Sequence, residues 1–168
     1  LYEEGSMAIR EKLEGDDLDF GIVIISDAAP TLQALPMATC QTVVGVPLNH
    51  PLAAKKSLTY ADIGASNLIM MKDGSFLRSQ LLDALRLASI TPNIVLESNQ
   101  IETLKALIRN GVGISLFLDF VLENVPGIVA LPLDPPLHYE LGMAWKKDRY
   151  VSKAAQAFID FCRDSLIH

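Results

Sequence analysis

The sequence predicts an α/β fold in which helices cover a mostly parallel sheet. The clearest evidence lies in residues 101–117. Apolar residues recur there at the spacing that lines one face of a helix, at Ile101, Leu104, Leu107 and Ile108. Asn110-Gly111 then tolerates a left-handed helix stop, and residues 112–117 are an apolar run typical of a buried strand. A helix, a glycine stop and a buried strand make up half of a βαβ unit.

The alternation of strands and helices continues along the chain and supports the same fold class. Apolar or β-branched runs predict strands over residues 18–25, 39–46, 67–71, 94–97, 112–117, 128–131 and 139–145. Amphipathic patterns predict helices over residues 6–14, 76–88, 101–109 and from 152 to about 166. Residues 26–36 and 47–54 are expected to be loops, and residues 118–126 are ambiguous. In the last strand, Met143 and Trp145 should lie on one face and Ala144 on the other.

Polar residues at the predicted helix starts indicate how each helix begins. Serine side chains are expected to cap helices at Ser6, Ser75 and Ser152. For the helix over residues 101–109 the cap is either Ser98 or Asn99, and Glu102 is placed to close a capping box on Asn99. Gly15 is expected to end the first helix.

The composition is that of a globular chain and argues against several kinds of function. The 168 residues carry a formal net charge of −6 with scattered basic residues, so we expect no nucleic-acid surface on this chain. No apolar run approaches the roughly 18 residues of a membrane span. Cys40 and Cys162 form no paired motif, which favours a reducing cytoplasm. Because residue 1 is Leu and no leader precedes it, we expect that this is not the native start.

No residue pattern in the chain predicts catalysis, a metal site or a bound cofactor. Metal-ligand spacing does not link the histidines, His50, His138 and His168. Gly111-x-Gly113 lacks the third glycine of a dinucleotide fingerprint, because Leu116 stands there, and the order of strand and helix is reversed. A nucleophile elbow nearly occurs from Gly113, but Phe117 replaces its last glycine and Ser115 lies within the predicted strand. We therefore expect that the protein is not an enzyme.

Two helix starts favour the recognition of a ligand instead. Residues 73–78 lead from a predicted strand into a helix, and the N–H groups of a helix start favour a carboxylate or phosphate. Residues 4–6 have the same pattern at the first helix. Both segments also fit a plain serine cap with nothing bound, and the sequence leaves the two interpretations open. Phe117 and Trp145 could line a pocket, although aromatic residues on strands are also typical of core packing.

Four segments, taken in order, resemble elements of the LysR-type transcriptional regulators. Residues 15–24 (GDDLDFGIVI) resemble the family's G-x-LD-x-(A/G)-I strand, and residues 46–53 (VPLNHPLA) resemble its HPLA crossover. Residues 107–114 resemble its L-V-x-x-G-x-G-I element, and residues 145–160 resemble its closing strand and helix. Together these matches span nearly the whole chain.

The resemblance implies the effector-sensing domain of such a regulator, with a fold similar to a type-2 periplasmic binding protein. Two Rossmann-like subdomains would be joined by crossing hinge strands, with residues 1–46 and 138–168 in subdomain I and residues 47–137 in subdomain II. A small effector, expected to be a carboxylate or another anion, would bind in the cleft between them. By position, the ligand-binding residues would be Gly5, Ser6, Gly74, Ser75, Phe76, Ser98 and Phe117.

The chain also departs from the pattern of that family. The winged helix-turn-helix and its linker helix are absent, so DNA would be bound only through the missing part. The first strand, helix and second strand of subdomain I are also expected to be missing. An incomplete cleft would impair ligand binding, and the exposed sheet edge would favour self-association of this chain. The intact protein would be a homo-oligomer in the bacterial cytoplasm, without membrane contact.

The function that the resemblance implies is therefore to bind an effector and so modulate DNA binding and transcription by the intact protein. One alternative is a solute-binding protein of the same fold, which a leader and a first strand upstream in the gene would support. A second alternative is a dehydratase-type enzyme on this fold, although the Thr-Arg-Phe signature of such enzymes is absent here.

Overall fold

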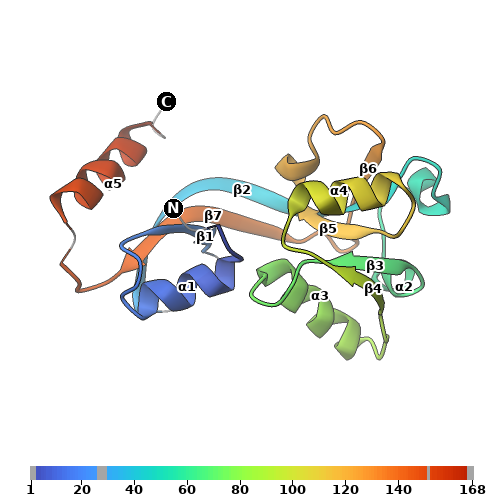
Figure 1. The fold of residues 1–168 in the computed structure, drawn as a ribbon, viewed down its shortest axis with the longest axis horizontal. Coiled ribbons are helices and arrows are strands. Elements are labelled where there is room, and N and C mark those ends of the chain that lie inside the picture. The colour runs from blue at the N-terminus through green and yellow to red at the C-terminus, as the bar shows by residue number, and fades with distance from the viewer. Residues whose placement is uncertain (1–2, 26–29, 151, 166–168) are drawn as a thin grey trace. The chain divides into compact units, whose positions relative to one another are not determined.

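The computed structural model describes residues 3–25, 30–150 and 152–165, and the chain forms two compact units. Unit 1 contains residues 1–39 and 139–168, and unit 2 contains residues 40–138. The chain passes from unit 1 to unit 2 within strand β2 (Leu32–Pro47) and returns at the start of strand β7 (His138–Lys146). These two strands are hydrogen-bonded neighbours in the strand order, and Figure 1 draws them side by side.

Strand β1 (Gly21–Ile24) lies at the end of the strand order β1-β7-β2 in unit 1. It pairs antiparallel with β7, with Gly21 opposite Ala144 and Ile24 opposite Leu141. The strand is shorter than the predicted one over residues 18–25, because only this part of the segment lies in register with β7. One edge of β1 therefore has no strand partner among the described residues.

Helices cover both faces of these strands. Helix α1 (Ser6–Glu14) packs on one face through a cluster of Ile9, Leu13, Val23, Leu32 and Ala144. Helix α5 (Lys153–Ser165) packs on the other face through Ile159, which clusters with Met143 and Trp145. Met143 and Trp145 thus share one side of β7 while Ala144 faces the other side, which confirms the predicted alternation.

Parallel and antiparallel strand pairs meet in unit 2. Strand β3 (Asn67–Met70) pairs parallel with β4 (Asn93–Glu97), and a parallel bridge from Leu68 to Ile114 joins β3 to the start of β5. Strand β2 runs antiparallel both to β5 (Ser115–Leu118) and to β6 (Ile128–Pro132). The prediction of a mostly parallel sheet is therefore wrong. The long strand β2 runs in the opposite direction to β5 and β6, so both of its strand pairs in unit 2 are antiparallel.

Two apolar clusters lie on opposite faces of the unit 2 sheet. Helices α3 (Phe76–Leu87) and α2 (Tyr60–Gly64) cover one face, and α4 (Ile101–Arg109) covers the other (Figure 1). The α3-side cluster contains Val44, Val46, Leu58, Ile63, Leu68, Met70, Leu81, Leu85, Ile114, Leu131 and Leu133. The α4-side cluster contains Val43, Ile69, Leu104, Ile108, Phe117 and Leu122.

The observed elements differ from the predicted ones mainly at their ends. Strand β2 begins at Leu32, inside a predicted loop, because Leu32 is buried in the unit 1 core and the backbone there runs beside β7. Residues 26–29 of that loop lie outside the described residues. Helix α2 was not predicted from the sequence, because it is only five residues long. The irregular segments contain two short 3-10 helices, η1 (Pro51–Ala54) and η2 (Asp119–Leu122).

Two predicted helix caps are wrong, because each side chain bonds elsewhere. Gly5 rather than Ser6 is the N-cap of α1, and Ser6 is the first helical residue. Gln100 is the N-cap of α4, while Asn99 Oδ1 accepts a hydrogen bond from Lys72 N at 3.0 Å. Glu102 bonds the Lys105 ammonium at 2.9 Å instead of closing a capping box, and this bond lowers the pKa of Glu102.

The other predicted caps and stops are confirmed. Ser75 caps α3, and Ser152 Oγ accepts a hydrogen bond from Ala155 N at 3.2 Å at the start of α5. Gly15 ends α1. Gly111 has a positive φ of 72° and ends α4, in the left-handed conformation that glycine adopts without strain.

Candidate functional site

The turn that leads into α3 is the best-defined candidate site in unit 2. Gly74 has a φ of 90°, a conformation that glycine adopts readily and other residues rarely do. Ser75 follows as the N-cap, and its hydroxyl oxygen accepts a hydrogen bond from Arg78 N at 3.5 Å. The serine is buried, and its hydroxyl also contacts the Met71 sulfur at 3.3 Å. The turn therefore starts a helix of 12 residues shortly after the end of β3, and the first N–H groups of such a helix have no partner within the helix.

Arg78 holds this turn in place. Its Nη1 donates to Met71 O at 2.9 Å and pairs with Glu97 Oε1 at 2.6 Å, and its Nε pairs with Asp73 Oδ1 at 3.0 Å. The Arg78 side chain is only 14% exposed, so these bonds are better shielded from solvent than those of an open surface pair. The sequence pattern alone did not predict this role of Arg78. A usable signal was the basic residue in the first turn of the helix, where the helix dipole disfavours it.

The loop after β4 is bonded to the loop after β3. Ser98 N donates to Met70 O at 3.0 Å, and Lys72 N donates to the Asn99 side chain at 3.0 Å. Ser98 Oγ accepts from Gln100 N at 3.1 Å. The structure thus brings Gly74, Ser75 and Ser98 to the carboxyl ends of two adjacent parallel strands. In open α/β sheets ligands bind outside this edge.

The two phenylalanines predicted as ligand contacts are both buried. Phe76 is 5% exposed in the first turn of α3. Phe117 is 2% exposed and packs in the α4-side cluster with Leu104 and Ile108. Phe117 is on the opposite face of the sheet from α3. A ligand-binding role for either ring stays a prediction.

The cavity beside the α3 start is small. It measures about 10 Å³, room for about one water molecule. Its lining comes from β3, β5 and the first turns of α3, with Leu68, Ile69, Met70, Met71, Ser75, Leu77, Arg78, Leu81, Ser115 and Leu116. A metabolite does not fit inside this cavity, so any ligand at the α3 start lies outside it.

In unit 1 the predicted site residues stand beside the edge of β1. Gly5 caps α1 through its backbone alone, and its carbonyl accepts from Ile9 N at 3.0 Å. Ile25 N donates to Glu140 O, so alternation directs the N–H of Ile24 away from β7. Ser6 Oγ accepts that N–H at 2.8 Å. Ser6 therefore satisfies a group on the outer edge of the sheet, and ligand binding by Gly5 and Ser6 stays a prediction.

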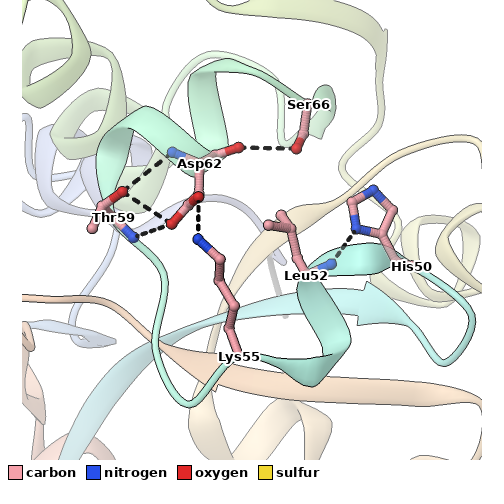
Figure 2. Close-up of polar contacts among 6 residues, drawn as sticks. All are labelled: His50, Leu52, Lys55, Thr59, Asp62 and Ser66. Atoms are coloured by element: carbon pink, nitrogen blue, oxygen red, sulfur yellow. Dashed lines mark hydrogen bonds and ion pairs between the residues drawn. The ribbon is translucent and has the colours of Figure 1, made fainter.

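His50 and Asp62 have local structural roles (Figure 2). His50 Nδ1 accepts from Leu52 N at 3.2 Å at the start of η1. Thr59 and Asp62 form a capping box for α2, and Lys55 Nζ bonds Asp62 Oδ1 at 2.5 Å. The Lys55 bond, together with the backbone N–H of Thr59, lowers the pKa of Asp62. These contacts account for the polar side chains of this segment without a ligand.

The described residues hold no arrangement typical of metal or redox chemistry. No group of three or more His, Cys, Asp or Glu side chains in them could hold a metal ion. Cys40 is buried, and burial, together with the charge of Asp119, raises the pKa of its thiol. A raised thiol pKa disfavours the reactive thiolate. Within the same part of the chain, none of the helices has the length and apolar character that crossing a membrane requires.

The whole chain matches a known family. Residues 1–167 match the LysR substrate binding domain, so the chain belongs to this family of transcriptional regulator domains. The resemblance seen in the sequence is thereby confirmed. The proteins of this family are regulators rather than enzymes.

Similar curated proteins are bacterial transcriptional regulators. The HTH-type transcriptional regulator YybE of Bacillus subtilis is 28% identical over 159 residues, which are 94% of this chain and 54% of that protein. The transcriptional dual regulator GltC of the same organism is 28% identical over 119 residues, which are 69% of this chain and 40% of that protein. The chain thus spans about half the length of the curated relatives it matches.

Solved structures with the same fold are effector-binding domains. The effector-binding domain of QuiR in complex with shikimate has a TM-score of 0.82 and 24% identity, and the match covers 99% of this chain and 80% of that one. The regulatory domain of Synechocystis CcmR in complex with 2-phosphoglycolate has a TM-score of 0.83 and 22% identity. This match covers 96% of this chain and 80% of that one. These domains have the type-2 periplasmic-binding-protein-like fold, which confirms the predicted fold class.

Proposed function

We propose that this chain is the part of a bacterial LysR-type regulator that senses a small anionic metabolite and thereby modulates DNA binding by the intact protein. The DNA contact belongs to a part of the regulator outside this chain, and the intact regulator works in the cytoplasm as a homo-oligomer. The observation that carries the proposal is the start of α3, where Gly74 and Ser75 orient the helix N-terminus and Arg78 holds the turn.

The chemistry of this turn fits an anion. A helix N-terminus carries a partial positive charge and N–H donors that suit a carboxylate or phosphate. The ligands of the two similar domains, shikimate and 2-phosphoglycolate, are both acids. Glu97 and Asp73 already pair with Arg78, so its guanidinium holds the turn and the helix start supplies the donors to the ligand.

We also propose that subdomain I is incomplete in this chain and that residues 1–46 with 138–168 and residues 47–137 are the two subdomains. The support comes from a groove of about 620 Å³ in unit 1. Its lining contains Glu3, Glu4, Ile9, Leu18, Asp19, Phe20, Gly21, Ile22 and Phe158. It runs along the open edge of β1, and the similar effector-binding domain of QuiR has a fifth of its chain beyond the match. A further strand and helix of that domain would cover this surface, and ligand binding by the present chain should be weaker without them.

A substitution at Ser75 tests the anion site. Ser75→Asp keeps an N-cap side chain but places a negative charge where the ligand's anionic group would lie. Ser75→Asn has nearly the same size, also caps helices and is neutral, so it is the matched control. Thermal shifts are measured for both variants and the wild type with shikimate, 2-phosphoglycolate, citrate, benzoate and sulfate.

The expected result is that at least one of these acids stabilises the wild type and Ser75→Asn but not Ser75→Asp. An acid present at about 100 times its dissociation constant adds about 2.7 kcal/mol to stability. Equal shifts for the Asp and Asn variants would place the anion away from α3. The absence of any shift in the wild type would count against the anion itself.

A further inference from the structure

The groove of unit 1 has the position and the walls that an added strand requires. It measures about 620 Å³ and runs along the outer edge of β1. Ile9 of α1 and Phe158 of α5 both line it, so the groove lies between the two helices that cover the faces of this sheet. An extended segment in the groove would be covered on both faces, as the inner strands of an α/β sheet are.

The backbone of β1 offers hydrogen-bonding groups to such a segment. Ile25 N donates to Glu140 O, so alternation directs the N–H and C=O groups of Ile22 and Ile24 away from β7. Ser6 Oγ accepts the N–H of Ile24 at 2.8 Å. Ile22 lines the groove, and its side chain is exposed. A strand added at this edge would bond the backbone groups of Ile22 and cover its side chain.

Acidic side chains stand at both ends of the open edge. Asp19 lies two residues before the start of β1. Glu3 and Glu4 closely precede Ser6, which is bonded to Ile24 at the other end of the strand. All three carboxylates line the groove, and none of the described basic residues does. The groove therefore has an apolar middle and an acidic end on each side.

Most of the net charge of the chain lies in this region. The first 20 residues contain seven acidic and two basic residues, so they carry a net charge of −5, out of −6 for the whole chain. Glu4 pairs with Lys12 at 2.7 Å, and Asp19 lies 3.5 Å from Arg149. Glu3 forms no ion pair among the described residues. The electrostatic potential at the groove is therefore negative, which favours a cationic partner.

We propose that the groove binds a strand of the regulator's own polypeptide from outside this chain, with about four apolar residues and a Lys or Arg at each end. This inference rests on the proposed incompleteness of subdomain I and adds the chemistry of the missing strand. The apolar run matches β1, which has four residues, and the basic ends pair with Asp19 and with Glu3 or Glu4. The similar domain of QuiR has a fifth of its chain beyond the match, which is room for such a strand. A second copy of this chain is a poorer occupant, because it would bring the same carboxylates to the edge.

Three peptides with blocked ends test the inference on the 168-residue chain. The first has the sequence Lys-Val-Leu-Val-Ile-Lys. The second has Glu in place of both Lys, and the third has Pro in place of the second Val. The Lys peptide should bind at least about 10-fold more tightly than the Glu peptide, because only its ends attract the carboxylates. It should also slow hydrogen exchange over residues 19–24, and the Pro peptide should not, since proline disrupts strand pairing.

Charge reversal in the chain provides the second measurement. Glu3→Lys should weaken binding of the Lys peptide about 2- to 10-fold and strengthen binding of the Glu peptide. Glu11 is exposed on the same helix side of the sheet but does not line the groove, so Glu11→Lys is the matched control. It should change both affinities much less. Equal effects of the two substitutions would show that the peptide does not contact the groove, and the inference would fail.

The outcomes separate this inference from the proposals on which it rests. Equal binding of the Lys and Glu peptides would overturn the basic character of the strand and leave the incomplete subdomain as proposed. Binding of neither peptide would overturn both, while the anion test at Ser75 stays independent of them. If the edge of β1 becomes protected without any peptide as the chain concentration rises, a second copy is the occupant and the inference is wrong.

Discussion

Helices cover the apolar clusters on both faces of the unit 2 sheet, whereas an open groove with apolar lining lies beside the end strand of unit 1. The α3-side and α4-side clusters of unit 2 are covered by helices. In unit 1, Ile22 on the end strand is 57% exposed, and Phe158 of α5 is 44% exposed although it stacks on Phe20 at 4.9 Å. The open groove of unit 1 is the surface that further residues would cover if subdomain I is incomplete, as proposed above.

The two units also differ in how their candidate site residues are held. In unit 2 a partly buried arginine and two bonded loops fix the α3 start before any ligand binds. In unit 1 the Ser6 hydroxyl already accepts a hydrogen bond from Ile24 N on the outer edge of β1. A preorganised site loses less free energy when it binds its ligand. We therefore expect the residues of unit 2 to dominate anion binding by this chain.

The largest effect should come from the core of unit 2. Leu85 is fully buried in the α3-side cluster, so Leu85→Ala should cost about 2–5 kcal/mol in the free energy of unfolding. Leu87 on the same helix is 82% exposed, and Leu87→Ala should change stability by less than about 0.5 kcal/mol. Urea denaturation measures both. Ile9→Ala in unit 1 should cost less than Leu85→Ala, because Ile9 lines the open groove, and an equal cost would break the contrast between the units.

The second prediction concerns one tightly packed glycine in each unit. A Cβ at Gly142 in unit 1 would lie 2.6 Å from Leu35 O, and a Cβ at Gly113 in unit 2 would lie 2.5 Å from Asn67 O. Because backbone must move in both cases, each Gly→Ala change should cost about 1–3 kcal/mol. Hydrogen exchange followed by mass spectrometry should show faster exchange mainly in the unit that carries the change. Gly15→Ala, with its nearest atom at 3.3 Å, is the milder control, and equal spread of fast exchange through both units would contradict this prediction.

A third prediction concerns association through the open edge of β1. Ile22→Thr should lower the average mass of the chain at high concentration, since it removes an exposed apolar side chain beside the unpaired edge. Sedimentation velocity measures this mass. Leu48 in unit 2 is 61% exposed but lies in a turn, so Leu48→Thr should leave the mass unchanged. A wild-type chain that stays monomeric at high concentration would remove the basis of this prediction.

The smallest effect compares one carboxylate from each unit. The pKa of Asp62 is lowered mainly by Lys55, and the pKa of Asp16 is lowered mainly by its hydrogen bond with Lys146. A lowered pKa in the folded state adds stability that is present above the ordinary value of 3.8 and is lost as the pH falls below it. At neutral pH, Asp62→Asn should therefore lower the urea midpoint slightly, and the difference from the wild type should vanish at acidic pH.

Asp16→Asn should have an even smaller effect. Asp16 is about half exposed, and its φ of 66° is a left-handed conformation that asparagine tolerates well. Urea midpoints at neutral and acidic pH check both variants. A larger loss for Asp16→Asn than for Asp62→Asn would reverse the expected order.

Local signals in the sequence predicted much of this fold, while signals that depend on distant partners did not. The stop of α4 at Gly111 follows from the residue itself, because glycine accepts a positive φ. The predicted cap of α4 was wrong because Asn99 Oδ1 accepts a hydrogen bond from Lys72 N, which is far away in the sequence. The predicted start of β2 was wrong for the same reason. Its pairing with β7, and not its own residue pattern, extends the strand to Leu32. Helix α2 could have been found, because Thr59 and Asp62 have the spacing of a capping box.

The candidate site divides in the same way. The Ser75 cap was evident from the residues that surround it. The ion pair of Arg78 with Glu97 joins a helix to the following strand, so it could not be seen without coordinates.

Unit 1 is built from both ends of the chain, and this has a consequence for biosynthesis. Unit 2 is a single continuous segment that ends at His138, so all of it is synthesised before the rest of β7 and α5. Domains tend to fold as units in the order of their synthesis. The first 39 residues of unit 1 thus leave the ribosome long before β7 and α5 exist to complete their sheet and core, and this interval is when a chaperone has most reason to hold the nascent chain.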